Sequence, residues 1–268
     1  MEMLSYEFMQ RAFIVGLIIG IIAPILGTVI VLKRYSMLTD ALAHISILGI
    51  AIAILIELSP VWVAIAVVVL SAWSIEFLRD HLKIYSDSLL SMFLSGALSL
   101  AIILISLTDS FNTSLLNYLF GSILTISNDD LITIAILGSA ILIFSVLFLH
   151  KIIYTTFDEE VAQVSGIPVK FYNFLFLILV SVLITISIKV VGSLLIGALI
   201  IIPVISAFQF NKSLITTIFI AIVFSLLSIF MGLTISYNFA LPSGTVIVLN
   251  AIFIFILSAL INKTNLKI

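Results

Sequence analysis

Long apolar stretches separated by short polar joins constrain this chain more than any other feature. Nine of them are long enough to cross about 30 Å of hydrocarbon as helices, which takes about 20 residues each. Because lipid offers no hydrogen-bond partners, a backbone that spans it must satisfy its own polar groups, and unbroken apolar runs of this length do so as helices. We therefore predict an all-α fold, a polytopic transmembrane helical bundle. The stretches cover residues 12–32, 37–56, 60–78, 88–107, 131–149, 170–188, 190–209, 213–236 and 243–262.

The composition leaves no room for a soluble domain. Hydrophobic residues make up 63% of the chain and charged residues only 9%, against about 25% charged residues in soluble proteins. The polar joins are far shorter than the roughly 50 residues that an independent domain needs, so we predict a single transmembrane domain over residues 1–268. Nucleic-acid binding is not expected of such a chain. Because cysteine is absent, disulfides and thiolate metal ligands are excluded.

The number of spans depends on two short segments. Residues 114–126 are apolar but too few to cross a membrane, so we expect a short re-entrant or interfacial segment there. The join at Lys189 is tight, which leaves eight spans as an alternative to nine. The first stretch is too long for a signal-peptide core and lacks a basic region before it, so we expect it to be retained.

The basic residues predict an orientation in the cell membrane. Cytoplasmic loops carry an excess of lysine and arginine. When successive spans alternate in direction, one arrangement leaves only Arg11 and Lys189 outside among the 11 basic residues. It places the N-terminus outside and the C-terminus inside. The chain is then a multi-pass protein of the plasma or inner membrane.

Two ionisable residues, Asp40 and His44, stand inside the second apolar stretch. A spacing of four places both side chains on one helix face, about one turn apart, and this pair of ligands suits zinc or manganese. Lipid does not solvate such side chains, so they normally face a bundle interior or a wet cavity. The alternative is that Ser36, Thr39 or Asp40 caps the start of the helix and that His44 is a core residue bonded to a carbonyl.

The largest loop on the predicted inner side, at about residues 151–169, contains a short helix with its own start and stop. Thr156 or Asp158 can cap its N-terminus, and Gly166 followed by Pro168 ends it.

This short helix carries a small apolar face formed by Val161 and Val164. Such a face is too small to fold alone, so we expect it to dock. It docks either onto its own bundle or into the groove of a partner protein.

Several short segments follow one another along the chain in a characteristic order. They are Ile-Leu-Gly-Thr at 25–28, Val-Leu-Lys-Arg at 31–34, Asp-Ala-Leu-Ala-His at 40–44, Tyr-Leu-Phe-Gly-Ser-Ile-Leu at 118–124, Asp-Glu-Glu at 158–160 with Gly-Ile at 166–167, Val-Gly-Ser-Leu-Leu at 191–195 with Ile-Ile-Pro at 201–203, and Ser-Tyr at 236–237 with Pro-Ser-Gly at 242–244. In this order they resemble the permease subunits of the bacterial zinc and manganese ABC importers. The resemblance covers almost the entire chain.

The resemblance implies a homodimeric permease that works with two cytoplasmic ATP-binding subunits and is fed by an extracytoplasmic metal-binding protein. It implies that Asp40 and His44 are metal ligands on the permeation path, with Zn²⁺ or Mn²⁺ as transported cargo and no tightly bound cofactor. It also implies that the short loop helix is a coupling helix seated in the ATPase. The residues given that role are Asp158, Glu159, Glu160, Val161, Val164, Gly166 and Pro168.

Smaller features bear on the choice of metal. Residues 4–11 and the Thr-Thr-Phe-Asp run at 155–158 look more like the zinc branch, so zinc is expected first and manganese next. Where many members of the family carry Gly directly before the acid, this chain has Leu38 and Thr39, which leaves the backbone geometry before Asp40 open.

The chain has no Gly-x-x-x-x-Gly-Lys-Ser/Thr phosphate loop, so we expect ATP to be hydrolysed on another chain and this one not to be an enzyme. One chain supplies only two ligands, whereas structural zinc takes four. We hypothesise that a two-fold axis joins two copies as Asp₂His₂, or that waters complete a looser site in each chain. The alternatives are a secondary carrier driven by an ion gradient without an ATPase, and a sensor or scaffold in which Asp40 and His44 are a structural pair.

Overall fold

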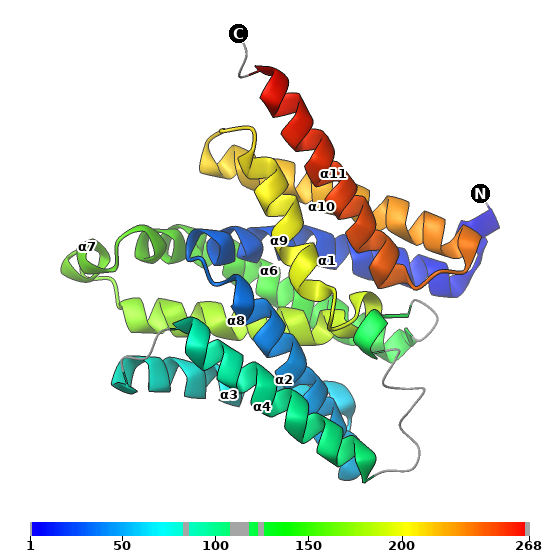
Figure 1. Cartoon of the computed structure of the whole chain (residues 1–268), viewed down its shortest axis with the longest axis horizontal. Helices are drawn as coiled ribbons and strands as arrows, with labels where there is room; N and C mark the ends of the chain where they lie inside the picture. Colours follow the sequence, from blue (N-terminus) through cyan, green and yellow to red (C-terminus); the bar gives the residue numbers. More distant parts are fainter. Residues whose placement is uncertain (1, 83–85, 108–117, 123–125, 266–268) are drawn as a thin grey trace.

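The computed structural model of the chain describes residues 2–82, 86–107, 118–122 and 126–265 (Figure 1). The described elements are all helices, which confirms the predicted all-α fold. In chain order they are η1 (Glu2–Ser5), α1 (Glu7–Leu32), α2 (Ser36–Leu55), α3 (Pro60–Leu82), α4 (Ser86–Ser106), α6 (Asn128–Phe157), α7 (Glu159–Val164), α8 (Val169–Val191), α9 (Ile196–Phe208), α10 (Leu214–Phe239) and α11 (Ser243–Asn265).

Among the described residues, eight helices are long and apolar enough to cross a membrane. The alternative of eight spans is therefore the one that the helix lengths support, and the full span predicted at 190–209 is wrong. Helix α8 runs on to Val191 and ends at Gly192, whose φ is 87°. The turn that follows leaves 13 residues for α9, which are about 20 Å long at 1.5 Å per residue and too short for a full crossing.

Helices α1 and α8 form the centre of the bundle. In each, 72% of the most apolar stretch is buried, against 22% in α3, α4 and α6. Helix α1 packs against α6, α8, α9 and α10 and passes through the middle of the molecule (Figure 1). Helix α2 packs against α3, α4, α8 and α9. Helix α2, which carries the ionisable pair, thus lies between α3 and α4 on one side and the central α8 on the other.

The basic residues form two groups, one at each end of the bundle. At one end, which we call the α7 end, Lys33 and Arg79 hydrogen-bond to residues of neighbouring helices. Arg11 and Lys189 lie together at the opposite end, against the segment that begins α6. This separation is the one that the predicted orientation requires, because that orientation leaves only Arg11 and Lys189 outside.

The segment predicted to be re-entrant or interfacial, at 114–126, is described in part. Residues 114–117 and 123–125 lie outside the described residues. The backbone of 193–194, between α8 and α9, donates hydrogen bonds of 2.9 and 3.2 Å to the carbonyls of residues 118 and 119. The Ser122 N–H donates to the Lys189 carbonyl at 3.0 Å. The described part of the segment is therefore fixed to the junction where α8 ends and α9 begins.

Three glycines make this close approach of backbones sterically allowed. Gly121 and Gly192 have φ of 73° and 87°, a region that favours glycine. A Cβ on either one would overlap the backbone of the other's segment. Gly244, near the start of α11, lies against the carbonyl groups of Phe120 and Val191, where a Cβ would also overlap. We call this meeting of three segments the glycine junction.

A buried glycine also sets the packing of the last two spans, and its replacement should destabilise the fold. A Cβ on Gly232 of α10 would lie 2.7 Å from the Cα of Ile247 in α11, and overpacking of this kind costs about 1–3 kcal/mol. We expect Gly232→Ala to lower the apparent melting temperature of the purified protein in detergent. In the control Gly96→Ala, the new Cβ meets nothing within 4 Å, so the melting temperature should not fall. Equal melting temperatures for the two variants would contradict the described packing.

Candidate functional site

Helix α2 begins without a side-chain cap. Its N-cap residue, Tyr35, makes no capping hydrogen bond. The Thr39 hydroxyl donates to the Ser36 carbonyl at 2.8 Å, within the first turn of the helix. Asp40 lies one turn inside the helix, where the backbone N–H groups already have helical partners. Helix capping therefore does not account for Asp40.

Asp40 and His44 lie on a face of α2 that the described part of the chain does not fully cover. The Asp40 side chain is exposed, and His44 is half-buried. His44 Nδ1 is buried and has no hydrogen-bond partner among the described residues. A core histidine would bond a carbonyl through such an atom, so the alternative of a satisfied core residue is not supported at Nδ1. Within the described ranges, one ring nitrogen of His44 is thus without a partner, beside a carboxylate one turn away.

Helix α9 closes the other side of Asp40. A Cβ built on Gly197, in the first turn of α9, would overlap Asp40 Oδ1 and lie 2.8 Å from Thr39 Oγ1. Gly197 is buried. Asp40 therefore lies between the exposed side of α2 and the backbone of α9. Sequence reasoning missed this contact, because position 197 was read as the middle of a full span.

The chain by itself does not complete a metal site. Among the described residues, no group of three or more His, Cys, Asp or Glu side chains could hold a metal ion. Asp40 and His44 thus offer one carboxylate and one imidazole, which can hold a divalent ion only with further ligands from water or from another chain. Their role as metal ligands stays a prediction.

Helix α7 forms as the sequence predicts. The Val161 N–H donates to Asp158 Oδ1 at 3.0 Å, so Asp158 caps the helix. Gly166, with a φ of 79°, follows its end. Pro168 then directly precedes α8 as its N-cap residue. The short loop helix is therefore fixed at both ends by residues that the sequence singled out.

The apolar face of α7 points away from its own bundle. Val161 is 48% exposed and Val164 is 91% exposed, whereas Ala162 between them is fully buried. The helix therefore rests on its own bundle through Ala162, whereas Val164 and about half of Val161 stay uncovered. The face is available to a partner protein, and the assignment of the seven coupling residues stays a prediction.

Two polar side chains that the sequence did not single out connect α7 to the start of α2. Glu159 Oε1 accepts a hydrogen bond from Asn173 Nδ2 at 3.1 Å. Lys33 Nζ, in the turn between α1 and α2, donates to Asn173 Oδ1 at 2.5 Å. We call Glu159, Asn173 and Lys33 the inner relay. An amide such as Asn173 near the start of an apolar stretch could have signalled it.

The ammonium group of Lys33 in the inner relay is partly buried, which disfavours its charged form. Burial lowers the pKa of Lys33 from 10.5, and Glu159 nearby offsets part of the effect. Among the other charged groups, Arg79 lowers the pKa further and Glu76 raises it. The ammonium group is thus kept in a partly desolvated position by its contact with Asn173.

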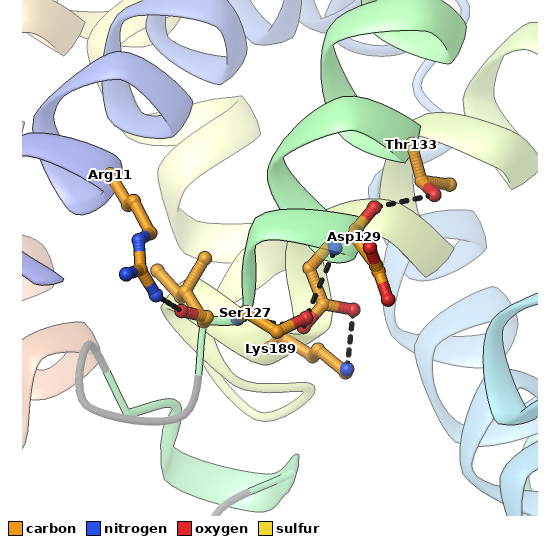
Figure 2. Close-up of polar contacts among 7 residues, drawn as sticks. Arg11, Ser127, Asp129, Thr133 and Lys189 are labelled. Atoms are coloured by element: carbon orange, nitrogen blue, oxygen red, sulfur yellow. Dashed lines mark hydrogen bonds and ion pairs between the residues drawn. The ribbon is translucent and has the colours of Figure 1, made fainter.

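The opposite end holds a second polar cluster (Figure 2). Lys189 Nζ pairs with Asp130 Oδ1 at 2.6 Å, and Ser127 forms a capping box with Asp130 at the start of α6. Arg11 Nη1 donates to the Ile126 carbonyl at 3.0 Å. The N-cap residue of α6 is Ser127. The cluster connects α1, α6 and α8, and within it the Lys189 ammonium balances the charge of Asp130.

Comparisons with known proteins agree over nearly the whole chain. The sequence profile of the ABC 3 transport family matches residues 5–262. The high-affinity zinc uptake system membrane protein ZnuB of Haemophilus influenzae is 31% identical over 94% of this chain and 97% of its own length. The manganese import system permease protein ScaB of Streptococcus gordonii is 32% identical over 95% of this chain and 91% of its own length.

A solved structure has the same fold. PsaBC from Streptococcus pneumoniae in complex with Fab matches with a TM-score of 0.86 and 32% sequence identity, over 96% of this chain and 92% of that chain.

The pKa of Lys33 predicts a pH dependence of stability. Because burial lowers this pKa in the folded chain, the unfolded chain binds the proton more tightly. Stability contributed by this group therefore rises as the pH increases from the lowered pKa to 10.5. We expect a rise of the apparent melting temperature over that range which Lys33→Met lacks. Lys212→Met, which removes an exposed lysine, should keep the rise. Parallel profiles for the native chain and Lys33→Met would refute this expectation.

Proposed function

The chain belongs to the ABC 3 transport family, and we propose that it is the membrane permease of an importer for a divalent transition metal, zinc first and manganese next. It is a multi-pass protein of the cell membrane and not itself a catalyst. ATP is hydrolysed by a separate subunit. The observation that carries the metal assignment is the pair Asp40 and His44 on a partly uncovered face of α2. His44 Nδ1 has no hydrogen-bond partner in the part of the chain that the structure describes.

The pair would act as a transient station for the ion. A divalent cation that leaves water needs protein donor atoms in place of its water ligands. Asp40 supplies an anionic oxygen donor and His44 a neutral nitrogen donor. In a homodimer whose two-fold axis faces the uncovered side of α2, both copies would form Asp₂His₂. Where the copies stay farther apart, waters would complete a looser site in each chain. Weak coordination favours transport, because a station must also release its ion.

Two partner proteins follow from this function. Cytoplasmic ATP-binding subunits would take the exposed Val161 and Val164 of α7 into a groove. An extracytoplasmic metal-binding protein would deliver the ion at the opposite end. The inner relay supports this coupling, since it connects Glu159 of α7 to Lys33, which lies three residues before the start of α2.

Family membership favours this function over the alternatives. A secondary carrier driven by an ion gradient would need no surface for an ATPase, and α7 presents an unused apolar face. A scaffold with a structural Asp40–His44 pair would satisfy His44 Nδ1 internally, and the described residues leave it without a partner.

Zinc and manganese are separated by a competition experiment. The run at 155–158 and the opening residues look like the zinc branch, whereas the named relatives include a zinc system and a manganese system. The importer, reconstituted from this chain with its ATPase and binding protein, would be offered both metals at equal concentration. We expect zinc to be taken up in excess, and an excess of manganese would reverse the order.

Removal of either ligand should slow metal transport strongly. We expect Asp40→Ala and His44→Ala each to reduce the initial uptake rate by about tenfold or more, since outer-sphere changes alone cost metal sites about 10–100-fold. Uptake of radioactive zinc and manganese is measured in cells and normalised to permease in the membrane. Asp129→Ala, which removes an exposed acid at the opposite end, serves as the control and should keep the rate. Unchanged uptake in both ligand variants would end the station hypothesis.

Charge on the apolar face of α7 should separate the permease from its ATPase. In the double variant Val161→Asp and Val164→Asp, two carboxylates replace exposed apolar contacts, and burying them in a groove would leave them unpaired. We expect the ATPase no longer to co-purify with the tagged permease and uptake to be lost, while the melting temperature of the permease stays the same. Gln163→Asp adds a charge on the same helix without removing an apolar contact and is the control. Intact uptake with a co-purifying ATPase would exclude α7 as the docking element.

A further inference from the structure

Gly197 of α9 is in contact with the proposed metal ligand Asp40. A Cβ at position 197 would overlap Asp40 Oδ1 and would lie 2.8 Å from Thr39 Oγ1. Real Cβ atoms essentially never approach other heavy atoms so closely. The carboxylate of Asp40 therefore occupies the space that any other side chain at position 197 would need.

Helix α9 is held in place independently of α2. The backbone of 193–194, just before α9, is hydrogen-bonded to that of 118–119. Helix α9 also packs against α10 and α11. On its other side, Gly27 of α1 packs so closely on α9 that a Cβ would overlap the Ile200 carbonyl. Since α9 is fixed on these sides, Asp40 rather than α9 would move if position 197 gained a side chain.

We propose that Gly197 is a positioning residue for metal transport, because its bare backbone sets where the Asp40 carboxylate lies relative to His44. This inference rests on the proposed function, in which Asp40 and His44 are the ligands. It adds that the ligand geometry is fixed by α9, whose start belongs to the glycine junction at the opposite end. A change in the glycine junction would then reach the Asp40 carboxylate through the start of α9.

A methyl group at position 197 should disturb the station without removing a ligand. In Gly197→Ala, the carboxylate has to rotate away from α9, so Asp40 and His44 no longer point to one ion in the same way. Groups that only orient metal ligands typically change metal affinity or activity by about 10–100-fold when mutated. We therefore expect metal uptake to fall by about tenfold, with both ligands still present.

The experiment compares metal moved with ATP hydrolysed. Importers with native permease, Gly197→Ala or Gly232→Ala are reconstituted in vesicles with the same ATPase and binding protein. Zinc and manganese uptake and ATP hydrolysis are measured per folded permease. We expect Gly197→Ala to lower the ratio of metal moved to ATP hydrolysed by about tenfold. Gly232→Ala, a buried glycine whose Cβ would meet Ile247 rather than α2 or α9, should keep the native ratio. A native ratio in Gly197→Ala overturns the proposal.

A thermal double-mutant cycle tests the contact itself, even where Gly197→Ala folds poorly. Gly197→Ala should lower the melting temperature of the native chain more than it lowers that of Asp40→Ala, in which the carboxylate no longer occupies the space. Gly232→Ala should lower both by the same amount, because it lies in another helix pair. Additive effects of Gly197→Ala and Asp40→Ala would mean that the carboxylate yields without cost, and a native metal-to-ATP ratio in Gly197→Ala would then overturn the proposal.

The two hypotheses fail in different ways. If Asp40→Ala transports metal at the native rate, the station of the proposed function is wrong. If Asp40→Ala stops transport while Gly197→Ala leaves the metal-to-ATP ratio unchanged, the station stands and only the positioning role of Gly197 is wrong.

Discussion

Hydrocarbon supplies no hydrogen-bond partners, so inside the membrane the backbone of this chain must satisfy its own polar groups. The arrangement of the helices follows from this constraint. The long spans satisfy their own N–H and carbonyl groups as helices. Between α8 and α9 the backbone is not helical, and the N–H groups of 193–194 donate hydrogen bonds to the carbonyls of 118–119. The glycine junction allows this contact, because Gly121, Gly192 and Gly244 have no side chain that would hold the backbone segments apart. A helix as short as α9 can therefore stand among full spans.

The same constraint applies to charged side chains, and it distinguishes residues with structural partners from the candidate metal ligands. Lys189 pairs with Asp130 at one end, and Lys33 bonds Asn173 at the other. Asp40 and His44 differ from these, since they lie on a face that is only partly covered and His44 Nδ1 has no described partner. Polar groups that protein has not satisfied inside an apolar segment are the ones expected to meet an ion.

In the proposed function, the metal station, the coupling helix and the glycine junction would act together. The inner relay connects Glu159 of α7 to the turn before α2, and α9 connects the glycine junction to Asp40 through Gly197. Movement at either end of the bundle would therefore reach the same carboxylate. In an importer this is what alternating access needs, because the ion must be held while one end closes and released when the other opens.

Sequence alone determined the helical class, the positions of most spans, the helix between Asp158 and Pro168 and the pairing of Asp40 with His44 on one face. Each of these follows from local rules: the length of an apolar run, the residues that start and stop a helix, and the spacing of side chains around it. Tertiary structure decided the shortness of α9, the outward direction of Val161 and Val164, and the contact of Gly197 with Asp40. The periodicity of the sequence does not reveal these features. Each depends on which segment, distant in the chain, packs against the residue and on how much space that segment leaves.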